Sequence, residues 1–216
     1  MTQHDDSPSG DRCYLEELLA CPGVEEEVIL RSRFGFMAFH GGSLEPYTDT
    51  IAMASAAACD ASVYVVRQPP NLRWHIPSTR YRTQESTKLA AFFDHVDVVI
   101  TVHGYRRKAF PRHVLLGGRN RRLARHVAAH LRPGLRGYVV EDDLENIPES
   151  IRGVRADNPV NVPVHNGVQV ELPHEIRGAH SFWLTARAKQ RELDRQNSEP
   201  ERLVTGLAES ARSFER

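Results

Sequence analysis

Short apolar runs separated by helix-like segments are the feature that most constrains the fold of this chain. Strand-like runs occupy residues 28–34, 36–40, 62–66, 96–103, 113–118 and 167–172. Helical patterns lie between them at 46–59, 86–95 and 119–131. Strands that alternate with helices of this length are typical of a mostly parallel or mixed central sheet with helices on both faces. We therefore expect a single α/β domain.

The two ends of the chain differ in composition from its middle. Residues 1–27 are expected to form a polar N-terminal segment with a short helix, and residues 185–216 a charged C-terminal helical extension. Between them, residues 28–184 carry the alternating pattern. A chain of 216 residues with 40% hydrophobic residues can bury a sizeable core, so this middle segment is expected to be the functional domain.

Two of the predicted strands end in His-Gly. FMAFHGGSLEP places His40 at a strand end and Glu45 beyond two glycines, and DVVITVHGY places His103 at the end of another strand. Because the carboxyl ends of parallel strands meet at one crevice, these side chains should converge. Two imidazoles and one carboxylate are the ligands of a catalytic zinc ion, whose fourth position takes water. The alternative is that both histidines only pack or hydrogen-bond at strand ends.

A carboxylate also lies within a largely apolar strand, GVQVELP. In this strand Val168, Val170 and Leu172 share one face, whereas Gln169 and Glu171 share the other. In a zinc amidase such a carboxylate would take a proton from water and return it to the leaving nitrogen. An ordinary solvent-facing or ion-paired glutamate is the alternative interpretation.

Charge is balanced over the whole chain but not locally. The 28 basic and 28 acidic residues leave no net charge, yet residues 104–140 contain ten Lys or Arg and no Asp or Glu. Arginine forms paired hydrogen bonds with carboxylates, so this segment suits an acidic substrate. Arg119, which follows two glycines near a helix start, is the first expected carboxylate anchor, and Arg177 is the second. The same arginines could contact phosphates, which keeps nucleic-acid binding as an alternative.

The loop WHIPSTRY is expected to flank the crevice at the strand ends. It carries His75 and Tyr81, with Ser78 and the following Arg82 as candidate substrate contacts.

HGGSLEP, followed by Thr48 and an alanine-rich helix, resembles the zinc motif of phage poly-γ-glutamate hydrolases. The resemblance extends from about Ile29 to Arg177 through VITVHGY, LLGGRN, Asn161 and GVQVELP. That family is related in fold to the zinc carboxypeptidases, so the resemblance implies a carboxypeptidase-like zinc hydrolase domain over residues 28–184. Two departures, Tyr47 in place of an expected glycine and Thr50 in place of an expected acidic residue, bear on the shape of the substrate cleft.

The resemblance also implies a ligand set and an activity. One zinc ion per chain would bind His40, Glu45 and His103, and Glu171 would be the catalytic glutamate in hydrolysis of γ-glutamyl amide bonds. The expected partner is then poly-γ-glutamate or another glutamate-containing amide.

Two other functions remain as alternatives. One is a zinc amidohydrolase acting on small γ-glutamyl or acyl-amino-acid amides. The other is a nucleic-acid-binding phage protein without catalysis, which would use the basic segment; the ordered motifs favour the hydrolase over it. No run approaches the roughly 20 apolar residues that span a bilayer, and no secretory signal pattern begins the chain. We expect synthesis in the cytoplasm, with release on lysis if a phage encodes the protein; the sequence does not indicate an oligomeric state.

Overall fold

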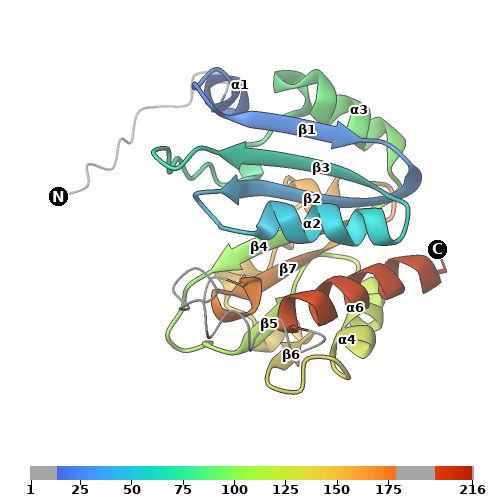
Figure 1. Ribbon diagram of the computed structural model, residues 1–216. Coiled ribbons are helices and arrows are strands. Elements are labelled where there is room, and N and C mark those ends of the chain that lie inside the picture. The colour runs from blue at the N-terminus through green and yellow to red at the C-terminus, as the bar shows by residue number, and fades with distance from the viewer. Residues whose placement is uncertain (1–13, 179–197, 216) are drawn as a thin grey trace.

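The computed structural model describes residues 14–178 and 198–215, which form a seven-stranded sheet with helices on both faces (Figure 1). The strands are β1 (Glu25–Ile29), β2 (Ser32–Gly42), β3 (Ala61–Gln68), β4 (Val98–Tyr105), β5 (His113–Leu116), β6 (Val139–Glu141) and β7 (Gly167–Pro173). The helices are α1 (Tyr14–Leu19), α2 (Thr48–Ala58), α3 (Thr87–His95), α4 (Arg121–Leu131) and α6 (Glu199–Ser213). Short 3-10 helices lie in the connections, among them η1 (Ser78–Arg80) and η6 (Glu175–Arg177).

The sheet is mixed, in the order β1-β3-β2-β4-β7-β5-β6. Strand β2 is parallel to β3 and to β4, β4 is parallel to β7, and β5 is parallel to β6. Strand β1 is antiparallel to β3, and β7 is antiparallel to β5. The expected α/β architecture is therefore confirmed. In the sheet, β3 lies on one side of β2 and β4 lies on the other. The strand order therefore changes direction between β2 and β4. Such a switch point is where ligands bind in open α/β sheets.

Strand alternation divides the core into two layers. Phe36 of β2, Ile100 of β4 and Val170 of β7 are buried in the larger layer with residues of α2, α4 and α6. Phe39 and Val99, which point to the opposite face, are buried with residues of α1 and α3. The period-two pattern of GVQVELP is confirmed for its apolar face, because Val168, Val170 and Leu172 all belong to the larger layer.

Two features of the predicted strand pattern are wrong. Residues 28–34 are not one strand, because β1 ends at Ile29 and β2 begins at Ser32. The chain must turn between them, since β1 is antiparallel to β3 and β2 is parallel to it. The turn is held by Ser62, whose Oγ accepts a hydrogen bond from the Arg31 amide at 2.8 Å. The edge strand β6, only three residues long, was not predicted.

The expected boundaries at residues 27/28 and 184/185 stay predictions, but two elements bear on them. Strand β1 begins at Glu25, so the first boundary falls inside a strand. Helix α6 belongs to the expected C-terminal extension, of which residues 185–197 lie outside the described residues. Its Leu203 and Leu207 are fully buried in the larger core layer. None of the helices described is long and apolar enough to cross a bilayer.

Because α6 contributes to the core, replacing Leu207 should destabilise the whole domain. We expect Leu207→Ala to lower the free energy of unfolding by about 2–5 kcal/mol, the usual cost of emptying a buried leucine site. Urea unfolding measures the change, and Thr205→Ala on the exposed side of the same helix serves as the control. Equal stability of the two variants would mean that residues 185–216 are an appendage.

Candidate active site

The candidate site lies where β2 and β4 part at their carboxyl ends. The last residues paired between these strands are Met37 and Thr101. Beyond them, His40 on β2 and His103 on β4 are buried, with 2% and 4% of their surfaces exposed. An irregularity in the pairing of β2 with β3 falls between Ala38 and Gly41. Such a bulge re-aims the side chains near it, here including His40.

The Glu45 carboxylate joins the two strand ends. Its Oε1 lies 2.8 Å from Nδ1 of His40, and its Oε2 lies 3.6 Å from Nδ1 of His103. The same Oε2 accepts a hydrogen bond of 2.7 Å from the amide of Gly104. Burial alone would raise the pKa of Glu45, but the charges and hydrogen bonds of His40 and His103 hold it far below its ordinary value. The carboxylate is therefore ionised at neutral pH and can act as a metal ligand.

The hydrogen bonds of His40 fix its tautomer. Its Nε2 lies 2.9 Å from the carbonyl oxygen of Ile76. A carbonyl oxygen only accepts, so Nε2 carries a proton and a neutral ring presents the lone pair of Nδ1 to Glu45. Two lone pairs 2.8 Å apart require a proton or a cation between them. A metal-binding histidine held through its other nitrogen by a backbone carbonyl has this same arrangement.

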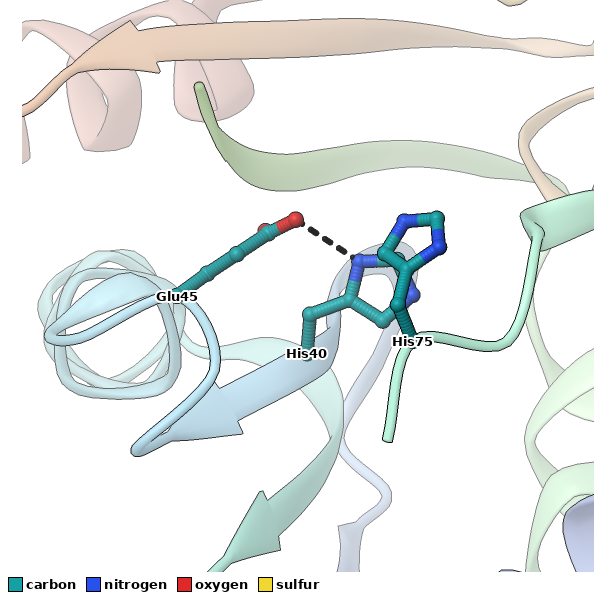
Figure 2. Close-up of side chains that lie close together, drawn as sticks. All are labelled: His40, Glu45 and His75. Carbon is teal, nitrogen blue, oxygen red and sulfur yellow. Dashed lines mark hydrogen bonds and ion pairs between the residues drawn. The ribbon is translucent and has the colours of Figure 1, made fainter. Parts of the chain in front are cut away.

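A third imidazole, that of His75, lies beside His40 (Figure 2). The two ring centroids are 4.8 Å apart. Ligand atoms of His40, Glu45 and His75 all lie within 4.8 Å of one another, which makes them a candidate metal site. The ring of His103 is also close, with its centroid 5.2 Å from that of His40. The sequence placed His75 only in a flanking loop, and no spacing signal joins it to the strand-end histidines.

Glu171 lies next to these imidazoles on β7. It is paired in register with His103 on the parallel neighbour β4, so the two side chains leave the same face of the sheet. Only 5% of its surface is exposed, and its Oε1 accepts a hydrogen bond of 2.9 Å from Nε2 of Gln169. Burial raises the pKa of Glu171 to about 7; the charge of Glu45 adds to this, while His103, Gln169 and His40 oppose it. A carboxyl group that titrates near neutrality suits proton transfer in both directions.

Arg177 packs against the end of β4. It lies in η6, and only 5% of its surface is exposed. Its Nη1 donates a hydrogen bond to the carbonyl of Pro46 at 2.9 Å. Within the described part of the chain its buried Nε has no hydrogen-bond partner. Its guanidinium covers Gly104, where an added Cβ would lie 2.5 Å from Nη1. A buried arginine with a free donor can bind an anion.

Of the other three expected substrate contacts, one lines a cleft of about 770 Å³ whose wall also contains His75. Ser78 lines the cleft at the start of η1. Arg119 is exposed, and its Nε donates to the carbonyl of Val154 in the cleft wall at 2.8 Å. Arg82 is exposed and turns toward its own loop, where Nη1 donates to the carbonyls of Thr79 and Tyr81 at 2.6 and 3.2 Å. The structure therefore places Ser78 in the cleft wall, whereas Arg119 contacts a wall residue from outside the lining and Arg82 contacts its own loop.

Much of the basic segment at residues 104–140 has contacts within the protein. Arg121 donates to the carbonyls of Leu116, Gly118 and Asp142. Arg132 pairs with the carboxylate of Asp142 at 2.5 Å. These guanidinium groups tie α4 to the end of β6, so local charge in the sequence overstates the number of arginines available to a substrate.

Tyr47, one of the two departures from the family pattern, has a left-handed backbone. Its φ is 73° at the entry to α2, a conformation that glycine adopts without steric cost. The residue therefore keeps the turn that glycine would make, and its side chain is 38% exposed.

Comparison with known proteins adds a family and a shared fold. A family model described as poly-gamma-glutamate hydrolase matches residues 17–203. No curated protein matches the chain by sequence. Among solved structures, a bacteriophage poly-gamma-glutamate hydrolase matches with a TM-score of 0.71 and 18% identity, over 90% of this chain and 91% of that one. The zinc-free apo structure of YNDL matches with a TM-score of 0.68 and 20% identity, over 88% and 90%.

A more distant match relates the fold to carboxypeptidases. A candidate carboxypeptidase of Burkholderia mallei has a TM-score of 0.51 and 10% identity, over 93% of this chain and 67% of that one. The carboxypeptidase-like architecture expected from the sequence is therefore confirmed.

The left-handed conformation of Tyr47 yields a prediction about stability. We expect Tyr47→Gly to raise the free energy of unfolding by about 1 kcal/mol, because glycine removes the clash of Cβ with the backbone. Tyr47→Ala is the matched control, since it removes the same ring and keeps Cβ. Thermal unfolding of both variants measures the difference, and an equal change in the two would contradict a backbone origin.

Proposed function

This chain belongs to the poly-gamma-glutamate hydrolase family, and we propose that it cleaves γ-glutamyl amide bonds of poly-γ-glutamate with one zinc ion bound to His40, Glu45 and His103. The observation that carries this proposal is the Glu45 carboxylate, which meets a different imidazole with each of its oxygens. Family membership makes the chain a hydrolase with a polyglutamate substrate. The metal, its ligands and the residue roles are the proposed part.

The residues at the site fit a zinc ion. Two imidazoles and one carboxylate are a common catalytic zinc set, and Nδ1 of His40 faces Glu45 at 2.8 Å, where a cation could replace a shared proton. His103 is proposed as the second imidazole because it is buried and lies opposite the base Glu171, whereas His75 is exposed. When bound, zinc supplies Lewis acidity that polarises a carbonyl and lowers the pKa of water to about 7.

Glu171 is proposed as the general base and acid. Its carboxylate would accept a proton from the attacking water and then donate it to the nitrogen that leaves the cleaved amide. Its raised pKa, about 7, keeps the protonated and ionised forms close in energy at neutral pH. The burial that raises this pKa also keeps bulk water from competing for the proton.

Arginines are proposed to bind the carboxylates of the polymer. Each unit of poly-γ-glutamate carries a free α-carboxylate, which matches the paired donors of a guanidinium group. Among the described residues Arg177 has a buried Nε without a hydrogen-bond partner, and Arg119 contacts the backbone of Val154 in the cleft wall. Ser78 in the cleft and Arg82 on the adjacent loop are proposed as further contacts.

The two alternative functions are less well supported. The family match names the polymer rather than a small amide. A nucleic-acid-binding role without catalysis gives no reason for a buried carboxylate beside two histidines, and several arginines of the basic segment bind groups within the protein.

The proposal predicts the metal content and activity of single variants. Wild-type protein should contain one zinc ion per chain by elemental analysis and should shorten poly-γ-glutamate. His103→Ala should lose most of the zinc, because a ligand is removed. Glu171→Gln should keep the zinc and lose about 10²–10⁴-fold in kcat, the usual contribution of general acid–base catalysis.

His75→Ala is the matched control for the choice of third ligand, because His75 lies at a similar distance from His40 as His103 does. If His75→Ala lost the zinc and His103→Ala kept it, the ligand set would be His40, Glu45 and His75. Metal-free, inactive wild-type protein would reject the zinc mechanism altogether.

The pKa of Glu171 predicts an acid limb in the rate. A base must be ionised, so kcat/KM should fall about tenfold per pH unit once Glu171 is protonated. Burial moves this pKa up from 4.5 to about 7, and a bound cation would move it down, so the limb should lie between these values. Zinc content measured at each pH separates this limb from loss of metal; a flat rate from pH 7 to 4.5 with zinc retained would contradict the role of Glu171.

The same shift has a consequence for stability. The pKa of Glu171 in the folded protein lies above its ordinary value, so protonation of this group stabilises the folded state relative to the unfolded state. In metal-free protein this stabilising contribution is complete below about pH 4.5 and is lost as the pH rises through about 7.

A further inference from the structure

Gln169 lies on the same face of β7 as Glu171, and both ends of its side-chain amide form hydrogen bonds. Its Nε2 donates to Oε1 of Glu171 at 2.9 Å and to the carbonyl of Ile151 at 3.1 Å. Its Oε1 accepts from Nδ2 of Asn158 at 3.1 Å. Both groups reached by Nε2 are acceptors and the group reached by Oε1 is a donor, so only one orientation of the amide satisfies all three.

Packing holds Gln169 in this position. Its surface is 5% exposed, and Gly153 lies directly against its amide, with a backbone φ of 64°. A Cβ on Gly153 would lie 2.5 Å from Oε1 of Gln169. The loop can approach so closely only because this residue is glycine. The glutamine side chain therefore has little freedom to change its rotamer.

The same amide reaches the proposed substrate cleft. Gln169 and Asn158 both line the cleft of about 770 Å³ that also contains Ser78 and His75. Asn158 is itself held in place, because its Oδ1 accepts a hydrogen bond from the Val160 amide at 3.1 Å. A chain of hydrogen bonds thus runs from the cleft wall through Asn158 and Gln169 to Glu171.

We propose that Gln169 is the positioning residue for the catalytic carboxylate: it holds Oε1 of Glu171 in place and leaves Oε2 to exchange the proton. This inference rests on the proposed role of Glu171 as the base. Asn158 acts one step further out, since its donor sets which end of the Gln169 amide faces Glu171. A fixed carboxylate favours proton transfer because the reacting geometry is already present before the substrate binds.

The test compares kcat and KM for poly-γ-glutamate in zinc-loaded variants at the pH where wild-type kcat is maximal. Gln169→Met keeps the length of the side chain and removes its donor. Its kcat should fall about 10–100-fold, as for other residues that orient a reactive group, with KM within about threefold and zinc content unchanged. In a Glu171→Gln background the same substitution should change the residual kcat less than about twofold, because its effect passes through Glu171.

Asn158→Asp tests the chain of hydrogen bonds without altering Gln169 or Glu171. It keeps the acceptor for the Val160 amide and places an oxygen where Gln169 needs a donor. The Gln169 amide should then turn over and lose its donor to Glu171, lowering kcat at least about fivefold. Once Gln169→Met is present, Asn158→Asp should have little further effect on kcat.

Ser62→Ala is the control for loss of a buried polar side chain with two backbone hydrogen bonds. Ser62 is fully buried near the start of β3, at the opposite end of that strand from the candidate site; its Oγ accepts from the Arg31 amide at 2.8 Å and donates to the carbonyl of Ser32 at 2.7 Å. This control variant should lose stability while its kcat stays within about threefold of wild type. An equal loss of kcat in this variant would overturn the inference, and so would wild-type kcat in folded Gln169→Met or Asn158→Asp. Wild-type kcat in Glu171→Gln would instead reject the proposed base.

Discussion

The ionised carboxylate of Glu45 is the interaction on which the arrangement at the strand ends depends. It contacts His40 of β2 through one oxygen and both His103 and the Gly104 amide of β4 through the other. These strands are no longer paired at this level of the sheet, and the carboxylate provides a direct polar link between them. Buried negative charge is costly without such partners. The two imidazoles and the Gly104 amide are therefore needed to retain Glu45, and Glu45 in turn orients both rings.

Gly104 contacts two side chains of opposite charge, those of Glu45 and Arg177. Its amide donates to Glu45, while the absence of a Cβ leaves room for the guanidinium of Arg177. A cation and an anion thus approach the same stretch of backbone from different directions. Burial lowers the pKa of Arg177, and the nearby carboxylates of Glu45, Glu171 and Glu175 counteract this shift. The site consequently holds one arginine close to two proposed catalytic or metal-binding carboxylates without a direct ion pair to either among the contacts described.

The sequence predicted the parts of the site that follow from strand periodicity. His103 was predicted at the end of one strand and Glu171 within another, both with clear apolar patterns. The structure pairs the two residues on the neighbouring parallel strands β4 and β7. Glu45 could also be expected near His40, because only a short glycine-containing loop separates them. His75 could not be placed, since its position depends on how the loop after β3 folds back. The contact of Gln169 with Asn158 could not be predicted either, because it depends on the path of the irregular loop and the single 3-10 helix (Pro159–Asn161) between them. The arginines of the basic segment were misleading for a related reason: charge in a sequence does not reveal which carbonyl groups, such as Leu116 and Asp142, the folded chain supplies to them.

The hydrogen bond from His40 to Ile76 uses the backbone of Ile76 and not its side chain. The side chain at this position is fully buried in the smaller core layer, where any apolar group of similar volume meets the packing requirement. Natural variation at position 76 should therefore include several apolar residues of similar size, with one backbone conformation. In related proteins, the orientation of the first histidine would then be inherited through the path of the loop, and a sequence comparison that scores identities alone would miss it.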